Sequence, residues 1–189
     1  MNKVRKPIVL VFAGPNGSGK TTLTRSLPTF GTYINADDLK AEYNLTDLEA
    51  AQQGELLRNK LVDKGADFSF EIIMSIERNL LLLEKARTIG YEVQCIYVLT
   101  CDESINVARV KARHAAGGHK VPEDNVRERY QRALALIPRL VDVCDKMLIY
   151  DNSVSPKLIF HKEKAGTAIF SSELWSYEAL QYLLTLNKC

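Results

Sequence analysis

The sequence predicts an α/β fold with three layers, in which helices cover a five-stranded parallel sheet. Three observations lead to this prediction. Short apolar runs rich in β-branched residues alternate with longer stretches of helical pattern. A glycine-rich turn follows the first apolar run, and Gly65 and Gly90 stand where helical stretches stop. The length of 189 residues fits one domain, since domains typically run to about 100–200 residues.

Five apolar runs are the expected parallel strands. The run at 8–13 is continuous and typical of a strand buried on both faces, and 93–99 is the next clearest. The other three are expected at 33–35, 68–70 and 147–151. Helices are expected at 20–26, 36–43, 48–64 and 76–88, from 102 or 103 to 116, and from Pro122 past Leu134.

The end of the chain follows a different pattern. Two strands at 157–161 and 167–170 flank a polar stretch and read as a β-hairpin. Ser171 or Ser172 can cap a final helix at 173–186. We therefore expect one domain over 1–189, with a core at about 7–153, a lid at about 109–126 and a small hairpin-and-helix appendage at about 156–189.

Composition and charge exclude several classes of protein. With 25 Lys and Arg against 23 Asp and Glu, the net charge of +2 gives no general attraction to nucleic acid or to an anionic membrane. The four cysteines form no CxxC pair that would indicate zinc, and they suit a reducing compartment. The six-residue apolar run at 8–13 is shorter than a secretion signal or a membrane span. A cytoplasmic protein without a membrane or nucleic-acid partner is expected.

The most specific signal is a complete G-x-x-x-x-G-K-[ST] motif between a predicted strand and a predicted helix. Its glycines let backbone N–H groups turn toward a phosphate, and the helix N-terminus adds partial positive charge. Lys20 can reach the β- and γ-phosphates of ATP or GTP, and the Thr21 hydroxyl can ligate Mg²⁺. The residues expected to bind nucleotide are Gly14, Pro15, Asn16, Gly17, Ser18, Gly19, Lys20, Thr21 and Thr22.

Acidic residues follow two of the predicted strands, where ligands gather in parallel α/β sheets. Asp37 and Asp38 come just after the second strand, and one of them could accept the proton of an attacking hydroxyl. Asp37 is the expected base and Asp38 is expected to bind the substrate, although the two roles could be exchanged. Alternatively, an aspartate here only caps the following helix. Glu71 directly follows the third strand and could hold Mg²⁺ or accept a hydrogen bond from the substrate.

Basic residues surround the Gly117-Gly118 break after the fourth strand. Arg109 and Arg113 share one helix face, which is the pattern of a lid that brings guanidinium groups to a migrating phosphoryl group. His119 could contact phosphate or substrate. The arginines of the next helix, Arg127, Arg129 and Arg132, read better as surface ion pairs, such as Glu128 with Arg132.

One further polar group follows the fifth strand. Asn152 could line the adenine pocket, or Asp151-Asn152-Ser153 could form an Asx turn.

Taken in order, these motifs resemble the zeta-toxin family of P-loop kinases. The matching segments are 13–22, 34–38, 68–71, the Arg109/Arg113 helix, 117–122 and 150–153. The resemblance implies a five-stranded parallel sheet and the ATP- and Mg²⁺-dependent phosphorylation of a UDP-N-acetyl sugar at a hydroxyl. It also implies that Asp37 is the base, that Glu71 contacts substrate, that Arg109 or Arg113 binds phosphate, and that a small antitoxin is a possible partner.

The chain departs from that family at positions that would contact the sugar nucleotide. Ile73 and Ser75 stand where the family carries Thr and Arg, and His119 stands in place of a second lid arginine. A kinase for another small metabolite or a nucleoside therefore stays open, as does a nucleotide-binding switch or ATPase without a phosphoryl acceptor.

Overall fold

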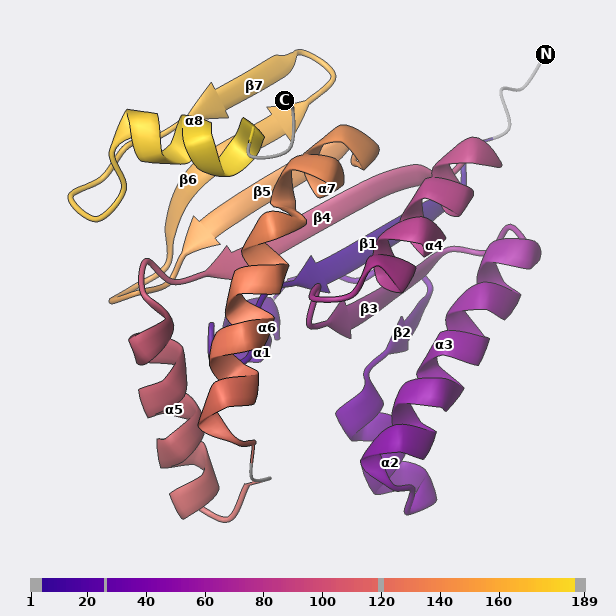
Figure 1. Ribbon diagram of the computed structural model, residues 1–189. Helices are drawn as coiled ribbons and strands as arrows, with labels where there is room; N and C mark the ends of the chain where they lie inside the picture. Colours follow the sequence, from indigo (N-terminus) through magenta and orange to yellow (C-terminus); the bar gives the residue numbers. More distant parts are fainter. Residues whose placement is uncertain (1–4, 26, 119–120, 186–189) are drawn as a thin grey trace.

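The computed structural model describes residues 5–25, 27–118 and 121–185, and these form one seven-stranded sheet with helices packed on it (Figure 1). The order of the strands across the sheet is β2-β3-β1-β4-β5-β6-β7. Their bounds are β1 Ile8–Ala13, β2 Thr32–Ile34, β3 Phe68–Ile72, β4 Glu92–Leu99, β5 Lys146–Asp151, β6 Lys157–Glu163 and β7 Gly166–Ile169.

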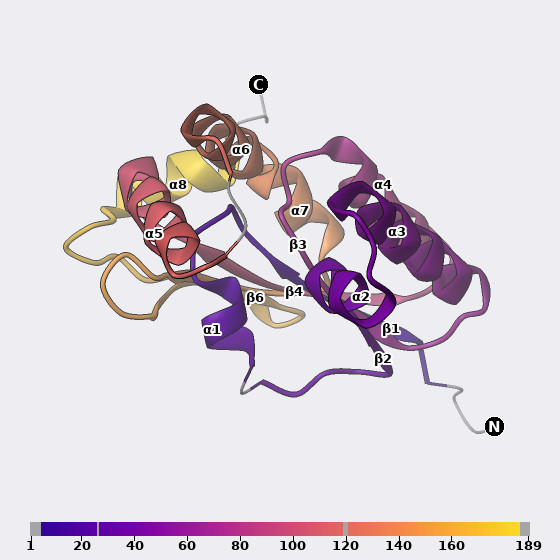
Figure 2. The same cartoon turned by 90° about the horizontal axis from the view of Figure 1, so that it is seen from below.

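The helices lie unequally on the two faces of the sheet. Figure 2 shows α1 on one face, whereas α3, α4, α7 and α8 lie over the other. The bounds are α1 Lys20–Thr24, α2 Ala36–Tyr43, α3 Asp47–Asp63, α4 Glu77–Thr88, α5 Glu103–Ala115, α6 Glu123–Ala135, α7 Ile137–Val143 and α8 Tyr177–Thr185. No helix among residues 5–25, 27–118 and 121–185 is long and apolar enough to cross a bilayer.

The predicted α/β fold is confirmed, and its parallel part has the five expected strands. β2, β3, β1, β4 and β5 pair in parallel, with β1 at the centre between β3 and β4. Val9, Val11 and Ala13 of β1 are fully buried, as expected for a strand covered on both faces.

The predicted C-terminal appendage is instead part of the sheet. β6 pairs antiparallel with β5, and β7 pairs antiparallel with β6, so the sheet has seven strands and not five. Ile159 and Phe160 of β6 are 1% and 3% exposed and belong to the main hydrophobic core. The hairpin joins the sheet because burying these side chains needs the neighbouring strand and helices.

The final helix begins later than predicted. Ser172 and Trp175 close a tight turn through two backbone hydrogen bonds, which leaves no helical backbone at 173–176. Trp175 turns into the main core, and the Ser176 hydroxyl accepts from the backbone N–H of Ala179. The cap is therefore Ser176 and not Ser171 or Ser172, and the predicted helix end at Leu186 lies outside the described residues.

The helix predicted from Pro122 past Leu134 is α6, and a further short helix, α7, follows it. α6 ends at Ala135, and α7 begins at Ile137 with Pro138 in its first turn. α5 and α6 share a small apolar cluster of their own, made by Val107, Val110 and Val126 with Val121 against it. The two helices thus form a hairpin with a small cluster of its own, while Leu134 near the end of α6 packs against the main core.

Candidate active site

The glycine-rich loop connects β1 to α1, and its shape is set by close packing against two neighbouring strand ends. Gly14 has φ 142°, and a Cβ on it would lie 2.0 Å from the carbonyl oxygen of Val98 in β4. Gly19 has φ 87°, and a Cβ on it would lie 2.2 Å from Nδ2 of Asn152, just after β5. Glycine is therefore required here both by backbone conformation and by the space that the neighbours leave.

Two asparagine side chains hold the loop from outside. Asn106 Nδ2 of α5 donates to the carbonyl of Asn16 at 2.5 Å, and Asn152 Nδ2 donates to the carbonyl of Ser18 at 2.8 Å. Asn152 thus supports the phosphate loop, while the Asx turn predicted beside it is formed by Asp151 Oδ1 and the N–H of Ser153 at 3.0 Å. With two carbonyls held outward, the loop can present its N–H groups to a phosphate.

Asn106 is a site residue that the sequence reading missed. It is fully buried and also accepts a hydrogen bond from the Thr100 hydroxyl. A detectable signal existed, because Asn106 lies on the face of α5 that carries the buried Val107 and Val110. A polar side chain on an apolar helix face needs a partner, which here is the loop.

Lys20 is the buried cation at the centre of the site. Its side chain is 8% exposed, and its Nζ donates to the carbonyl of Pro15 at 3.1 Å. The pKa of Lys20 is lowered to about 8, mainly by burial; the charge of Arg113 adds to the lowering, whereas the charges of Glu71 and Asp37 oppose it. These effects show that residues predicted from three separate segments converge on Lys20.

Thr21 and Glu71 meet directly. The Thr21 hydroxyl donates to Glu71 Oε1 at 2.7 Å, and Tyr33 OH lies 3.5 Å from Glu71 Oε2. A hydroxyl and a carboxylate in contact, close to a buried lysine, are the protein ligands that Mg²⁺ takes when phosphates and water supply the rest. In the part of the chain that the structure describes, no group of three or more His, Cys, Asp or Glu forms a metal cage.

The two aspartates at the start of α2 are free of the capping role. Asn35 caps this helix by accepting from the N–H of Asp37 at 2.9 Å, so the alternative that an aspartate is the cap is wrong. Both carboxylates are exposed. The charge of Asp37 acts on Lys20, whereas the charge of Asp38 acts on Tyr33. Asp37 is therefore the aspartate whose charge bears on the phosphate loop.

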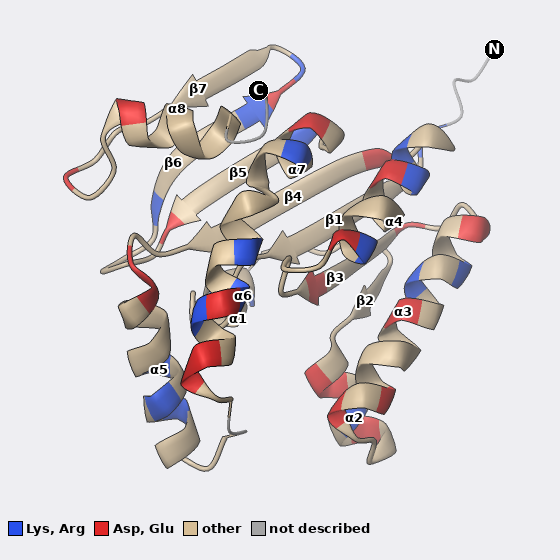
Figure 3. Cartoon of the chain, in the orientation of Figure 1, with Lys and Arg blue, Asp and Glu red and all other residues tan. Residues whose placement is uncertain are grey.

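The two arginines of α5, Arg109 and Arg113, differ in their burial and contacts. Arg109 Nη2 donates to the carbonyl of Ser153 at 3.0 Å, and its Nη1 is buried without a hydrogen-bond partner among the described residues. Arg113 is exposed, and its charge reaches Lys20. Figure 3 shows the basic residues of α5 at the same end of the sheet as the acids that open α2 and end β3.

Two arginines of α6 form ion pairs at the surface of the protein. Arg127 pairs with Glu103 at 2.9 Å and with Glu123 at 2.7 Å, and Arg132 lies 3.4 Å from Glu128. These are the surface ion pairs that the sequence predicted. His119 lies outside the described residues, and Thr22 is exposed in α1 without a contact that bears on its predicted role.

A buried polar atom in the loop tests whether a phosphate fits. Ser18 is fully buried, and its Oγ has no hydrogen-bond partner among the described residues. Buried hydroxyls without a partner are rare, and a bound phosphate oxygen would supply one. Together with Lys20 and the Thr21–Glu71 pair, this loop has the donors and ligands that a nucleoside triphosphate with Mg²⁺ requires.

Comparisons with known proteins identify the family of the chain. The family model described as zeta toxin matches residues 1–164. An uncharacterized protein of Haemophilus influenzae (strain ATCC 51907 / DSM 11121 / KW20 / Rd) is 29% identical over 127 residues, which are 64% of this chain and 91% of the relative.

Among solved structures, a chain of the PezAT chromosomal toxin–antitoxin system of Streptococcus pneumoniae is 16% identical, with a TM-score of 0.55 over 99% of this chain and 86% of that one. A chain of the AvrRxo1-ORF1:-ORF2 complex with ATP is 12% identical, with a TM-score of 0.71 over 95% of this chain and 64% of that one. These structural likenesses show the fold. Because the family model covers most of the sequence, the chain belongs to the zeta toxin family.

Proposed function

We propose that this protein is a kinase that uses ATP and Mg²⁺ to phosphorylate a hydroxyl of a small molecule. One observation carries the proposal: the Thr21 hydroxyl and the Glu71 carboxylate are in contact at 2.7 Å beside the buried Lys20 of a phosphate loop. Family membership supports a nucleotide-dependent kinase in general. The residue roles below, the metal and the acceptor belong to the proposal.

Each residue has a chemical task in this reaction. Lys20 and the loop N–H groups hold the β- and γ-phosphates, and Thr21 and Glu71 hold Mg²⁺, which supplies neutralisation of phosphate charge when bound. Asp37 accepts the proton of the acceptor hydroxyl as its oxygen bonds to the γ-phosphorus and the bond to the β-phosphate oxygen breaks, leaving ADP. Arg113 neutralises charge that develops on the transferred group.

The leading acceptor is a UDP-N-acetyl sugar, because this is the acceptor that the resemblance to the zeta toxin family implies. The pocket that would distinguish this acceptor from another metabolite includes the segment after Glu71. Ile73 is half-buried there, and Ser75 is 8% exposed and donates its N–H to the Ile73 carbonyl at 2.8 Å. A small antitoxin is proposed as a partner, since similar solved chains come from a toxin–antitoxin system. A cytoplasmic location is proposed with it.

A transfer assay with γ-labelled ATP tests the proposal. Wild-type protein is incubated with UDP-N-acetylglucosamine, with other sugars and nucleosides, and with a metabolite extract. We expect Asp37→Asn to lower kcat by about 10²–10⁴-fold, as loss of a general base does, while MgATP still binds. Asp38→Asn is the matched control, because it removes the neighbouring exposed carboxylate.

Two results would overturn parts of the proposal. ATP turnover that is indifferent to every acceptor indicates a nucleotide switch or ATPase. Equal losses in Asp37→Asn and Asp38→Asn contradict the assignment of Asp37 as the base.

A further inference from the structure

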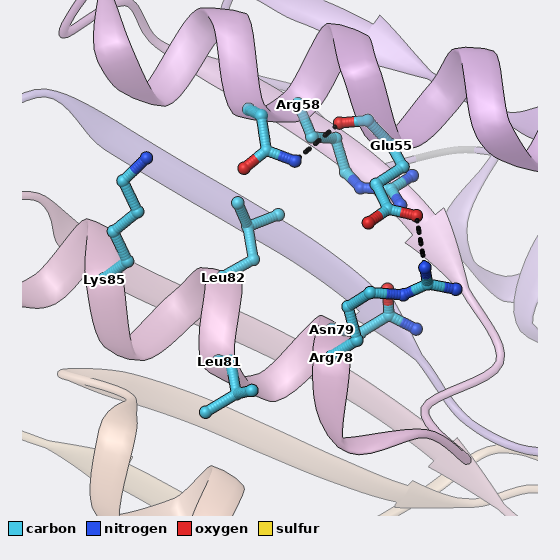
Figure 4. A pocket seen from close by; sticks show the side chains of 8 residues that line it. Glu55, Arg58, Arg78, Asn79, Leu81, Leu82 and Lys85 are labelled. Atoms are coloured by element: carbon cyan, nitrogen blue, oxygen red, sulfur yellow. Dashed lines mark hydrogen bonds and ion pairs between the residues drawn. The ribbon is translucent and has the colours of Figure 1, made fainter.

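A pocket of about 210 Å³ lies between α3 and α4, on the face of the sheet opposite α1 (Figures 2 and 4). Six of the eight residues that line it are of polar or charged type, and the other two are leucines. The polar and charged lining residues are Glu55, Arg58, Asn59, Arg78, Asn79 and Lys85. None of these residues has a part in the site described above.

The most unusual group in this pocket is the guanidinium of Arg58. Arg58 is 6% exposed, and its Nε has no hydrogen-bond partner among the described residues. The guanidinium lies over the ring of Phe70, with 5.1 Å from Cζ to the ring centroid. A Cβ on Gly54 would come within 3.3 Å of Arg58 Nη1, so the missing side chain leaves room for this group.

The charged residues near Arg58 do not fully neutralise its guanidinium group. Glu55 is the acid in the lining, and its carboxylate lies 3.3 Å from Arg78. Figure 4 shows Arg58 and Arg78 on either side of Glu55. Lys85 is bonded to Asp63 at 2.7 Å. Two guanidinium groups thus share one carboxylate, which leaves one positive charge in excess.

Burial makes that excess costly. The pKa of Arg58 is lowered to about 10, mainly by desolvation; the charge of Glu55 opposes this lowering and the charge of Arg78 adds to it. Buried charges in proteins are normally paired, and a guanidinium fork without an acceptor fits a phosphate or a carboxylate. The chemistry of the pocket therefore calls for an anion.

The position of the pocket connects it with the acceptor. Phe70, under the Arg58 guanidinium, pairs with Ile34 in the last parallel rung between β2 and β3. Glu71 is the next residue after Phe70, and Asp37 lies three residues after Ile34. Arg78 is the second residue of α4, which follows β3 by a short loop. The pocket thus lies near the carboxyl end of β3, on the face of the strand opposite the Thr21–Glu71 contact.

We propose that Arg58 and Arg78 bind an anionic group, a phosphate or a carboxylate, of the molecule whose hydroxyl is phosphorylated. The proposal rests on the proposed kinase function and narrows its acceptor to an anionic metabolite. Arg58 contacts the anion from the buried side of the pocket. The side chain of Arg78, which is 68% exposed, leaves Glu55 and contacts the anion from the solvent side.

The test is a calorimetric titration of the full chain with its phosphate loop first saturated by a non-hydrolysable ATP analogue and Mg²⁺. The probes are inorganic phosphate and, separately, acetate, which distinguish the two kinds of anion. We expect one of them to bind wild type, and Arg78→Met or Arg58→Met to weaken that binding about tenfold or more, as loss of a charge-assisted hydrogen bond does. Lys60→Met, an exposed cation on α3 outside the pocket, should bind as wild type does.

The outcomes separate this inference from the kinase proposal. If the ATP analogue binds but neither probe does, or if the arginine variants bind the probe like wild type, the anion subsite is wrong and the kinase proposal stands. If the analogue fails to bind, the kinase proposal fails first. Arg58→Lys, which keeps the charge, and a thermal melt of every variant guard against misfolding.

Kinetics give a second readout once an acceptor is known. The arginine variants should raise KM for the acceptor and leave KM for ATP unchanged. Equal effects on both KM values would indicate a general structural role and contradict the proposal.

Discussion

Replacing the phosphate-loop lysine should stabilise the protein in the absence of nucleotide. The pKa of Lys20 falls from 10.5 to about 8 because the side chain is buried. Each pKa unit corresponds to about 1.4 kcal/mol, so keeping the ammonium charged at pH 7 costs the folded state about 3 kcal/mol. Lys20→Met removes this cost and loses the bond to the Pro15 carbonyl, worth about 1 kcal/mol.

The net gain of about 2 kcal/mol corresponds to a rise in Tm of about 4–8 °C for a domain of this size. The assay is thermal unfolding without nucleotide, with Lys60→Met as the control, since loss of an exposed cation changes stability by about 0.5 kcal/mol or less. The variant should also lose MgATP binding.

The dependence on pH provides an independent check. The folded-state pKa of Lys20 lies below its unfolded value, so the unfolded chain binds more protons between pH 8 and 10.5. The Lys20 contribution to wild-type stability therefore rises with pH across this window, and the advantage of Lys20→Met should shrink there. A variant that melts at or below the wild-type temperature at pH 7 would refute the reasoning.

Three further predictions follow from the described contacts. Gly19→Ala places a Cβ 2.2 Å from Asn152 Nδ2 at a backbone φ of 87°. The free energy of unfolding, measured by chemical denaturation, should fall by about 1–3 kcal/mol, and the affinity for MgATP, measured by calorimetry, should drop. The affinity of the wild type for MgATP should be constant below pH 8 and fall by up to about tenfold per pH unit above it. The reason is that Lys20 must then take up a proton to bind phosphate. A calorimetric affinity that stays constant up to pH 10 would contradict this. Phe160→Ala should cost about 3–5 kcal/mol if β6 belongs to the core, whereas a separate appendage would leave the main unfolding transition unchanged.

Much of the fold could be predicted because its signals are local. β1 and α2 have the predicted bounds, since a continuous β-branched run and a capped amphipathic stretch each depend on neighbours in sequence. The glycine-rich loop could also be predicted, because glycines at this fixed spacing between a strand and a helix are typical of phosphate-binding loops. The order of the five parallel strands then places Asp37, Glu71 and Lys20 at one end of the sheet.

What the sequence did not reveal depends on contacts between distant segments. The hairpin at β6 and β7 looked like an appendage because the burial of Phe160 and Trp175 is decided by other elements. Arg58 sits in a largely polar helix, where a cation usually faces solvent, and only the packing on Phe70 buries it. The position of Asn106 on an apolar helix face indicated that it needs a partner, but the identity of that partner, 90 residues away, depends on the fold.

The distant supports of the loop also bear on when the loop takes its shape during synthesis. The backbone of β4, the side chain of Asn106 and the side chain of Asn152 shape the loop, and all three come after it in the sequence. Domains fold as units while the chain is made. A nascent chain that ends before Asn152 therefore carries the complete motif without the Asn152 contact that helps to shape the loop.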